Sequence, residues 1–131
     1  MDKIETRPLK PTQDLLEMNE WLTARGKAPV SLSGIPELGL MAENSQGPIA
    51  AAFIRRCEGN VGMIDGLVTN PKASSLDRHQ AIDLVVQRLL AIAKTLELTR
   101  VLAFSTDEGT LRRSEKHGFR KTNYIVISQS L

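Results

Sequence analysis

A carboxylate lies within an otherwise apolar segment, VGMIDGLVT (Val61–Thr69). A charged side chain in such a segment is costly unless it has a partner or faces a cleft. Asp65 is therefore predicted to be either a functional carboxylate in a cleft or a structural one, bonded to a backbone turn or to an arginine. If the segment is a strand, its two-residue repeat puts Asp65 on the same face as Leu67 and Thr69.

A second group of residues with useful chemistry lies in NPKASSLDRHQ (Asn70–Gln80). Arg78 lies near the start of an expected helix, where a cation opposes the helix dipole, so an anionic partner is favoured over a solvated surface role. His79 can add at most a weak contact to a phosphate. His79 and His117 lack the spacing of metal ligands, and Cys57, the single cysteine, has no neighbouring base. We therefore predict no metal site and no cysteine nucleophile.

The composition indicates one domain that spans residues 1–131. Hydrophobic residues make up 41% of the chain, which is enough for a single core. The net charge of +2, with acidic and basic residues interspersed, and the aromatic content of 4% argue against nucleic-acid binding. The lone cysteine, together with the lack of an apolar signal core or a membrane-length apolar run, predicts a cytoplasmic protein without membrane association.

Hydrophobic periodicity predicts the elements that would position these residues. The most regular is a helix over 75–96, whose apolar face includes Ile82, Val85 and Leu89 and whose N-cap is Ser74 or Ser75. The expected elements are a strand at 3–9, a helix at 11–26, a loop at 27–36 over a site, strands at 37–43, 48–56 and 61–69, the helix at 75–96, a strand at 100–104, a helix at 108–118 and a strand at 120–128.

The order β-α-β-β-β-α-β-α-β predicts an α/β fold with a central mixed sheet, in which an antiparallel meander lies beside a parallel βαβ pair. The strands at 48–56 and 61–69 are apolar enough to be buried on both faces. Where a sheet changes from antiparallel to parallel, neighbouring strands can splay and clefts form at strand C-termini. We expect such a cleft beside Thr69.

Two motifs add to this order, IDGLVTNP…RHQAIDLVVQRLLAIAK and EGTLRRSEKHGF. With the element order, they resemble the GNAT superfamily of CoA-dependent N-acetyltransferases over most of the chain from Leu38 onward. The residues that match the family's pattern are Leu67, Thr69, Pro71 and Arg78 in the first motif and Lys116, Gly118 and Phe119 in the second. The compact size is also similar to that of short GNAT-like proteins carried by bacteriophages.

The resemblance implies acetyl-CoA as co-substrate, with pantetheine pairing along a strand edge and pyrophosphate on backbone N–H groups at a helix start. The residues that it implies at this site are Leu67, Val68, Thr69, Lys72, Arg78, His79, Gln80 and Ala81. It implies Asp65 as general base and Ser114, at the position of the family's tyrosine, as a weak acid that water can replace. The acceptor would be a primary amine of an unknown protein or small molecule.

The departures from the family pattern concern the phosphate-binding loop. His79, Ala81 and Asp83 occupy the positions of its glycines, and the loop is about four residues longer than the common pattern. A carboxylate at Asp83 would repel a pyrophosphate placed beside it. If Ser75 starts the helix early, however, free N–H groups lie near 76–78 and Asp83 lies a turn or more inside the helix.

These departures leave a second function open, a non-catalytic interaction module that keeps the fold and has lost the cofactor site. Binding of CoA is the property that separates the two functions. After Phe119 there is room for a single good strand where family members often have two, so an open sheet edge could be covered by a second copy in a homodimer.

Overall fold

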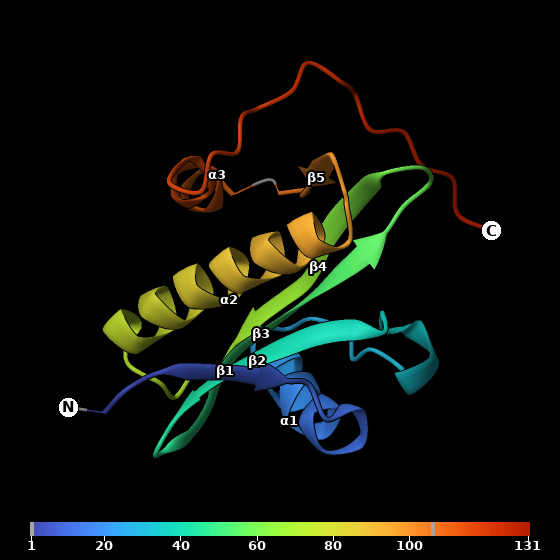
Figure 1. Cartoon of the computed structure of the whole chain (residues 1–131). Helices are drawn as coiled ribbons and strands as arrows, with labels where there is room; N and C mark the ends of the chain where they lie inside the picture. The colour runs from blue at the N-terminus through green and yellow to red at the C-terminus, as the bar shows by residue number, and fades with distance from the viewer. Residues whose placement is uncertain (1, 106) are drawn as a thin grey trace.

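Five strands form one sheet in the order β1-β2-β3-β4-β5, and helices cover both of its faces (Figure 1). This computed structural model describes residues 2–105 and 107–131. Helix α1 packs on one face and α2 on the other, each with its own apolar cluster against the strands. Along the chain the elements are β1 (Glu5–Pro8), α1 (Pro11–Ala24), the 3-10 turn η1 (Leu32–Gly34), β2 (Leu38–Asn44), β3 (Gly47–Arg56), β4 (Val61–Thr69), α2 (Ser75–Thr95), β5 (Arg100–Leu102) and α3 (Glu108–Glu115).

The sheet is mixed, which confirms the predicted α/β fold class. Strands β1 to β4 pair with their neighbours in antiparallel fashion. Strand β5 joins β4 in parallel, and this pairing runs from Val61 with Arg100 to Met63 with Leu102. Helix α2 is the crossover between these two strands, since parallel strands need such a connection.

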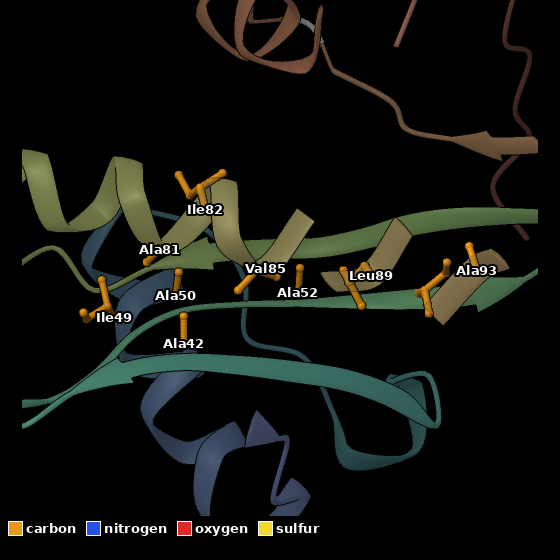
Figure 2. Close-up of a cluster of buried hydrophobic side chains, with 10 residues drawn as sticks. Ala42, Ile49, Ala50, Ala52, Ala81, Ile82, Val85, Leu89 and Ala93 are labelled. Carbon is orange, nitrogen blue, oxygen red and sulfur yellow. The ribbon is translucent and has the colours of Figure 1, made fainter. Parts of the chain in front are cut away.

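The core depends on small side chains at the centre of the sheet. Ala50, Ala51 and Ala52 of β3 are completely buried. Ala50 and Ala52 belong to the cluster under α2, whereas Ala51 belongs to the cluster under α1. Val85 and Leu89 of α2 lie against this strand (Figure 2). Strand β3 is thus buried on both faces, as the sequence predicts.

Strand β4 does not follow that prediction. Only Gly62 and Val68 within it are buried, and Gly66 and Leu67 are exposed. The expectation of burial on both faces is wrong here, because among the described residues β5 pairs only with the first three residues of β4.

A bulge lies in the second half of β4. Asp65 pairs with Phe53 and Val68 pairs with Ala51, so β4 has one residue more than β3 across this interval. Gly66 has a φ of 68°, and a Cβ atom there would lie 2.9 Å from the ring of Phe53. Both the backbone conformation and the close approach of the ring therefore require glycine.

The bulge changes which face the end of the strand presents. Thr69 pairs with Ala50, which belongs to the α2 side, whereas Asp65 pairs with Phe53, which belongs to the α1 side. Directly opposed residues in an antiparallel pair share a face. The predicted common face for Asp65 and Thr69 is therefore wrong, because the count of two residues per repeat is interrupted at the bulge.

Helix α2 begins at Ser75, which is the early start predicted from Ser74 and Ser75. Ser74 has an extended backbone conformation, and its side chain accepts a hydrogen bond of 3.1 Å from the amide of Asp77. These two features make Ser74 the N-cap. The first helical residue is Ser75. Asp83 consequently lies about two turns inside the helix, well away from its N-terminus.

The last expected strand does not form. Residues 120–128 have no strand structure, and Tyr124, Ile125, Val126 and Ile127 are between 66% and 89% exposed. In Figure 1 this segment leaves α3 as an extended trace without a partner strand. A β-prone sequence becomes a strand only when a neighbour supplies the hydrogen bonds, so the prediction of a strand at 120–128 is wrong for the isolated chain.

An ion pair between the half-buried Arg7 and the buried Asp14 fixes the N-terminal strand to the first helix. Arg7 donates two hydrogen bonds to Asp14, at 2.7 and 2.9 Å, and a third contact of 3.1 Å joins it to Glu43 of β2. The amide of Lys10, the N-cap of α1, donates to the same Asp14 carboxylate at 2.6 Å. Hydrogen bonding from Arg7 lowers the pKa of Asp14 against the opposing effect of burial.

Candidate functional site

The edge of β4 opens where β5 ends. Pairing between the two strands stops at Met63, while β4 continues for six residues, 64–69. Within the part of the chain that the structure describes, no strand lies on that side of this half of β4. Its backbone groups on the β5 side are therefore available to an extended ligand, which can add as a further strand.

A cleft of about 1070 Å³ lies along this open edge on the α1 side of the sheet. Its floor includes Asp65, Gly66 and Leu67 of β4. Its walls come from α1, from the loop around η1, from the residues after β5, from Thr110 of α3 and from Val126 of the C-terminal segment. The predicted loop at 27–36 does border the site, with Lys27 and Val30 among its lining residues. The volume suits a small-molecule pocket.

Asp65 is the carboxylate on the floor of this cleft. Its side chain is 44% exposed and lies 3.4 Å from a guanidinium nitrogen of Arg55. The same nitrogen lies 3.4 Å from the carbonyl oxygen of Gly34 in η1. Asp65 thus has both features that the sequence left as alternatives, an arginine partner and a cleft, and the arginine also connects it to the loop.

A second carboxylate on the cleft wall, Asp107, is already engaged. It is the N-cap of α3 and accepts hydrogen bonds from the amide of Thr110 at 3.0 Å and from the hydroxyl of Thr110 at 2.8 Å. The hydrogen bonds from Thr110 lower the pKa of Asp107. Asp107 caps a helix, whereas Asp65 has one longer contact, of 3.4 Å, with the half-exposed Arg55, so Asp65 is the carboxylate of this cleft that a ligand can reach more easily.

The three predicted residues at the end of β4 lie in different surroundings. Leu67 is 37% exposed and lines the cleft. Val68 is buried against Met18 and Trp21 of the α1-side cluster, so only its backbone can contact a ligand. Thr69 accepts hydrogen bonds from Arg25 at both its hydroxyl, at 2.8 Å, and its carbonyl group.

Arg25 is a residue that sequence reasoning missed. It is the C-cap of α1, and it reaches 44 positions along the chain to the end of β4. Its contacts with Thr69 fix the end of the open strand to the helix that forms a wall of the cleft. No local pattern indicates this contact, because the two residues come together only in the folded sheet.

Asn70 organises the loop between β4 and α2. Its side chain donates to the carbonyl of Pro48 at 3.1 Å and accepts from the amide of Lys72 at 2.9 Å, and its carbonyl accepts from the amide of Ala73. The Asn-Pro dipeptide is a turn signal that could have identified this residue from the sequence. The side chain of Lys72 remains exposed beside the loop.

The first turn of α2 contains the amides that matter for an anion. Ser74 occupies two of them, since its hydroxyl accepts from Asp77 and its carbonyl accepts from Arg78. The amides of Ser75 and Leu76 lie too early in the helix to bond to a carbonyl group within it, as is general for the first N–H groups of a helix. The amides without an acceptor inside the helix are therefore at its very start, slightly before the predicted range of 76–78.

Arg78 folds back on the loop rather than outward. Its guanidinium donates to the carbonyl groups of Pro71 and Ala73. His79 and Asp83, one turn apart on α2, face α3: His79 contacts Arg113 at 3.0 Å and Asp83 contacts His117 at 3.2 Å. Asp83 therefore serves the packing of the two helices and is not placed to repel a phosphate at the helix start.

The remaining predicted site residues lie away from the cleft. Ala81 is fully buried in the cluster between α2 and the sheet, so only its backbone could contact a cofactor, and its assignment to the cofactor site stays a prediction. Gln80 lines a separate shallow groove together with Asp83. Ser114 donates to the carbonyl of Leu111 at 2.7 Å and is not among the residues that line the cleft.

Two further features are absent from residues 2–105 and 107–131. There, no three His, Cys, Asp or Glu residues gather closely enough to hold a metal ion. Nor does any described helix combine the length and apolarity needed to cross a membrane. The candidate site is thus the cleft with its adjoining strand edge and helix start.

No protein-family model and no curated protein sequence matches the chain. Solved structures match almost all of it. A Mycobacterium tuberculosis protein in complex with CoA has 17% identity and a TM-score of 0.76, covering 95% of this chain and 76% of that one. An acetyltransferase of Trypanosoma brucei has 20% identity and a TM-score of 0.70, covering 98% and 100%.

A third solved structure extends this likeness to an enzyme with a known acceptor. Glucosamine-6-phosphate N-acetyltransferase of Arabidopsis thaliana has 14% identity and a TM-score of 0.68, with 98% of each chain covered. None of these three structures is described as a phage protein, and the narrower resemblance to phage proteins stays a prediction. At these identities the likeness establishes the fold, and the chain has the fold of the GNAT acetyltransferases.

Proposed function

We propose that the protein transfers the acetyl group of acetyl-CoA to the nitrogen of a primary amine. The observation that carries this proposal is the open edge of β4 at 64–69, which runs between a cleft containing a carboxylate and the capped start of α2. Solved relatives in fold are complexes with CoA or acetyl-CoA, which supports the same co-substrate here.

The residues present fit a CoA-type ligand in this proposal. Backbone groups of 67–69 other than the Thr69 carbonyl, which accepts from Arg25, would pair with its extended arm. The amides of Ser75 and Leu76 would hold its pyrophosphate at the positive end of the helix dipole. Lys72 would add an exposed positive charge. When bound, acetyl-CoA supplies the acetyl group as a thioester.

The chain's own contribution to the reaction centres on Asp65. An amine enters as an ammonium ion, and its nitrogen can attack only after a proton has left. Asp65 would hold the ammonium on the cleft floor and accept that proton. Because the hydroxyl of Ser114 already donates to Leu111, we assign protonation of the leaving thiolate to water rather than to Ser114.

A specific observation also favours the second candidate, a non-catalytic interaction module. The loop amides of Lys72 and Ala73 are already bonded to Asn70, and Arg78 is bonded to loop carbonyl groups. These contacts leave fewer donors for a pyrophosphate than a glycine-rich loop would offer. If they prevent CoA binding, the fold serves association with another molecule instead.

Removal of a single backbone N–H at the helix start tests the proposal. Proline is well tolerated at the first helical position, and Ser74, with φ −63° and ψ 155°, has the conformation that precedes proline comfortably. We expect Ser75→Pro to weaken CoA affinity about tenfold or more, as loss of a hydrogen bond to a charged group would. Ser75→Ala keeps the N–H and should bind CoA as the wild type does. Isothermal titration calorimetry measures both.

The wild-type protein provides the decisive comparison. CoA at one hundred times its dissociation constant should raise the free energy of unfolding by about 2.7 kcal/mol. A thermal unfolding midpoint that does not change at millimolar CoA would exclude the transferase and leave the interaction module. Equal weakening by Ser75→Pro and Ser75→Ala would mean that the hydroxyl, not the amide, contacts the ligand.

We also propose a homodimer in which the C-terminal segment of one copy covers the sheet edge of another. Strand β5 is the outer strand of the sheet, and Tyr124–Ile127 is apolar and exposed. Light scattering should give twice the monomer mass for the wild type. Ile125→Asp with Ile127→Asp, two positions on one face of an extended segment, should give the monomer mass. A monomeric wild type would contradict the dimer.

A further inference from the structure

The wall of the cleft that faces β4 is apolar and rigid. Leu15, Met18 and Leu22 of α1 line it at helical spacing. Leu15 and Met18 are almost fully buried, so these side chains are held by packing and do not move freely as surface side chains do. Across the cleft lie Phe53 and Leu67 of the sheet, so an occupant would have apolar surfaces on two sides.

The charged groups of the cleft are few and unevenly placed. Lys27, Asp65 and Asp107 are the charged residues in its lining, and Asp107 is engaged as the helix cap. Arg55, beside the floor, is paired with Asp65. An acceptor that carries a phosphate or several carboxylates would thus have to bury its charge near Asp65 with a single lysine for compensation, which is unfavourable.

We propose that the acceptor of the transferase is a small primary amine with an apolar alkyl or arylalkyl body and no second charge. This inference rests on the proposed function. The ammonium group contacts the carboxylate of Asp65 and replaces part of its contact with Arg55. The apolar body of the amine lies between the α1 wall and Leu67. The apolar walls give selectivity for chain length, because each added methylene removes further apolar surface from water.

A series of amines tests the acceptor class. With acetyl-CoA saturating, kcat/KM should rise about fourfold for each methylene from propylamine to hexylamine and should be high for phenethylamine. Glucosamine 6-phosphate and glutamate should be at least a hundredfold poorer. A flat response to chain length, or a preference for either charged acceptor, would overturn this inference while leaving acetyl transfer itself in place.

A pair of variants on one helix separates the wall from general effects. Leu22→Gln puts an amide into the cleft wall and should lower kcat/KM for hexylamine about tenfold, with little change for propylamine. Leu16→Gln changes an exposed residue of the same helix that does not line the cleft, and it should change neither value. An equal loss for both amines in Leu22→Gln would contradict an apolar wall for the acceptor.

Binding of the amine without CoA keeps this test separate from that of the proposed function. Phenethylamine titrated into the protein should shift the backbone amide resonances of Gly66 and Leu67 at millimolar concentration, and Asp65→Asn should weaken that binding at least tenfold. No shift would overturn the acceptor class even if CoA binds. A shift without any CoA binding would support the apolar amine site and overturn the transferase.

Discussion

Arg7→Met should lower the free energy of unfolding at pH 7 by about 3 kcal/mol, the effect of removing one partner from a buried ion pair. Asp14 is 4% exposed, and Arg7 supplies two of its hydrogen bonds. Methionine keeps the aliphatic length of the arginine side chain, so the loss reflects mainly a carboxylate left without its cation. Urea unfolding followed by tryptophan fluorescence measures it, since Trp21 lies in the adjacent cluster.

The strand before the helix offers a matched control. Lys3 and Glu5 form a wholly exposed ion pair at 3.8 Å, and Lys3→Met should change stability by less than about 0.5 kcal/mol. A double variant, Arg7→Met with Asp14→Leu, should recover much of the loss because no buried charge remains. A loss below about 1 kcal/mol in Arg7→Met alone would show that water reaches Asp14.

The difference between wild type and Arg7→Met should depend on pH in a definite direction. The folded-state pKa of Asp14 is lowered from its ordinary value of 3.8, so the stability that the pair contributes is present above about pH 4 and lost as pH falls through the lower, folded-state value. The gap between the two proteins should therefore shrink toward pH 3. Burial raises the pKa of Glu17, so Glu17 contributes to the pH dependence in the opposite sense in the wild type.

Asp65→Asn should lower kcat for acetyl transfer by about 10² to 10³ without changing the affinity for CoA, as expected when a general base is lost. Asparagine preserves the size of the side chain and a hydrogen-bond acceptor for Arg55, so the fold around η1 should persist. Stopped-flow or steady-state release of the CoA thiol gives kcat, and calorimetry gives the affinity. Circular dichroism checks the fold.

Asp83→Asn is the matched control for this variant. It removes a carboxylate from α2 that contacts His117, just after α3, and lies outside the cleft. Neither kcat nor CoA affinity should change. Full activity in Asp65→Asn would mean that this carboxylate only anchors Arg55 and the loop, whereas tighter CoA binding in Asp83→Asn would mean that Asp83 does act on the phosphates.

Local signals explain which parts of the fold could be predicted from the sequence. The start of α2 follows from Ser74, because an N-cap acts on residues within one turn. Gly118 ends the α3 region with a φ of 86°, the left-handed conformation that a glycine stop predicts. Such contacts lie within a few residues of each other, so a single sequence contains all that decides them.

The features that escaped prediction depend on partners distant in the chain. The bulge at Gly66 is set by the ring of Phe53 on the next strand, and it reversed the face expected for Thr69. Arg25 reaches Thr69 only once the sheet has formed. The segment 120–128 has every local property of a strand and lacks only a neighbour, which no count of β-prone residues can supply.

The three alanines at the centre of β3 have a consequence for how this core can change. An alanine side chain has no rotamers to lose on folding, so the middle of the sheet is ordered at almost no side-chain entropy cost. The same smallness lets α1 and α2 approach from both sides and leaves only one methyl group at each position to remove. Apart from glycine, any replacement of Ala50, Ala51 or Ala52 is larger and would separate a helix from the sheet. Substitutions that add side-chain volume at the centre of the sheet should therefore destabilise the fold.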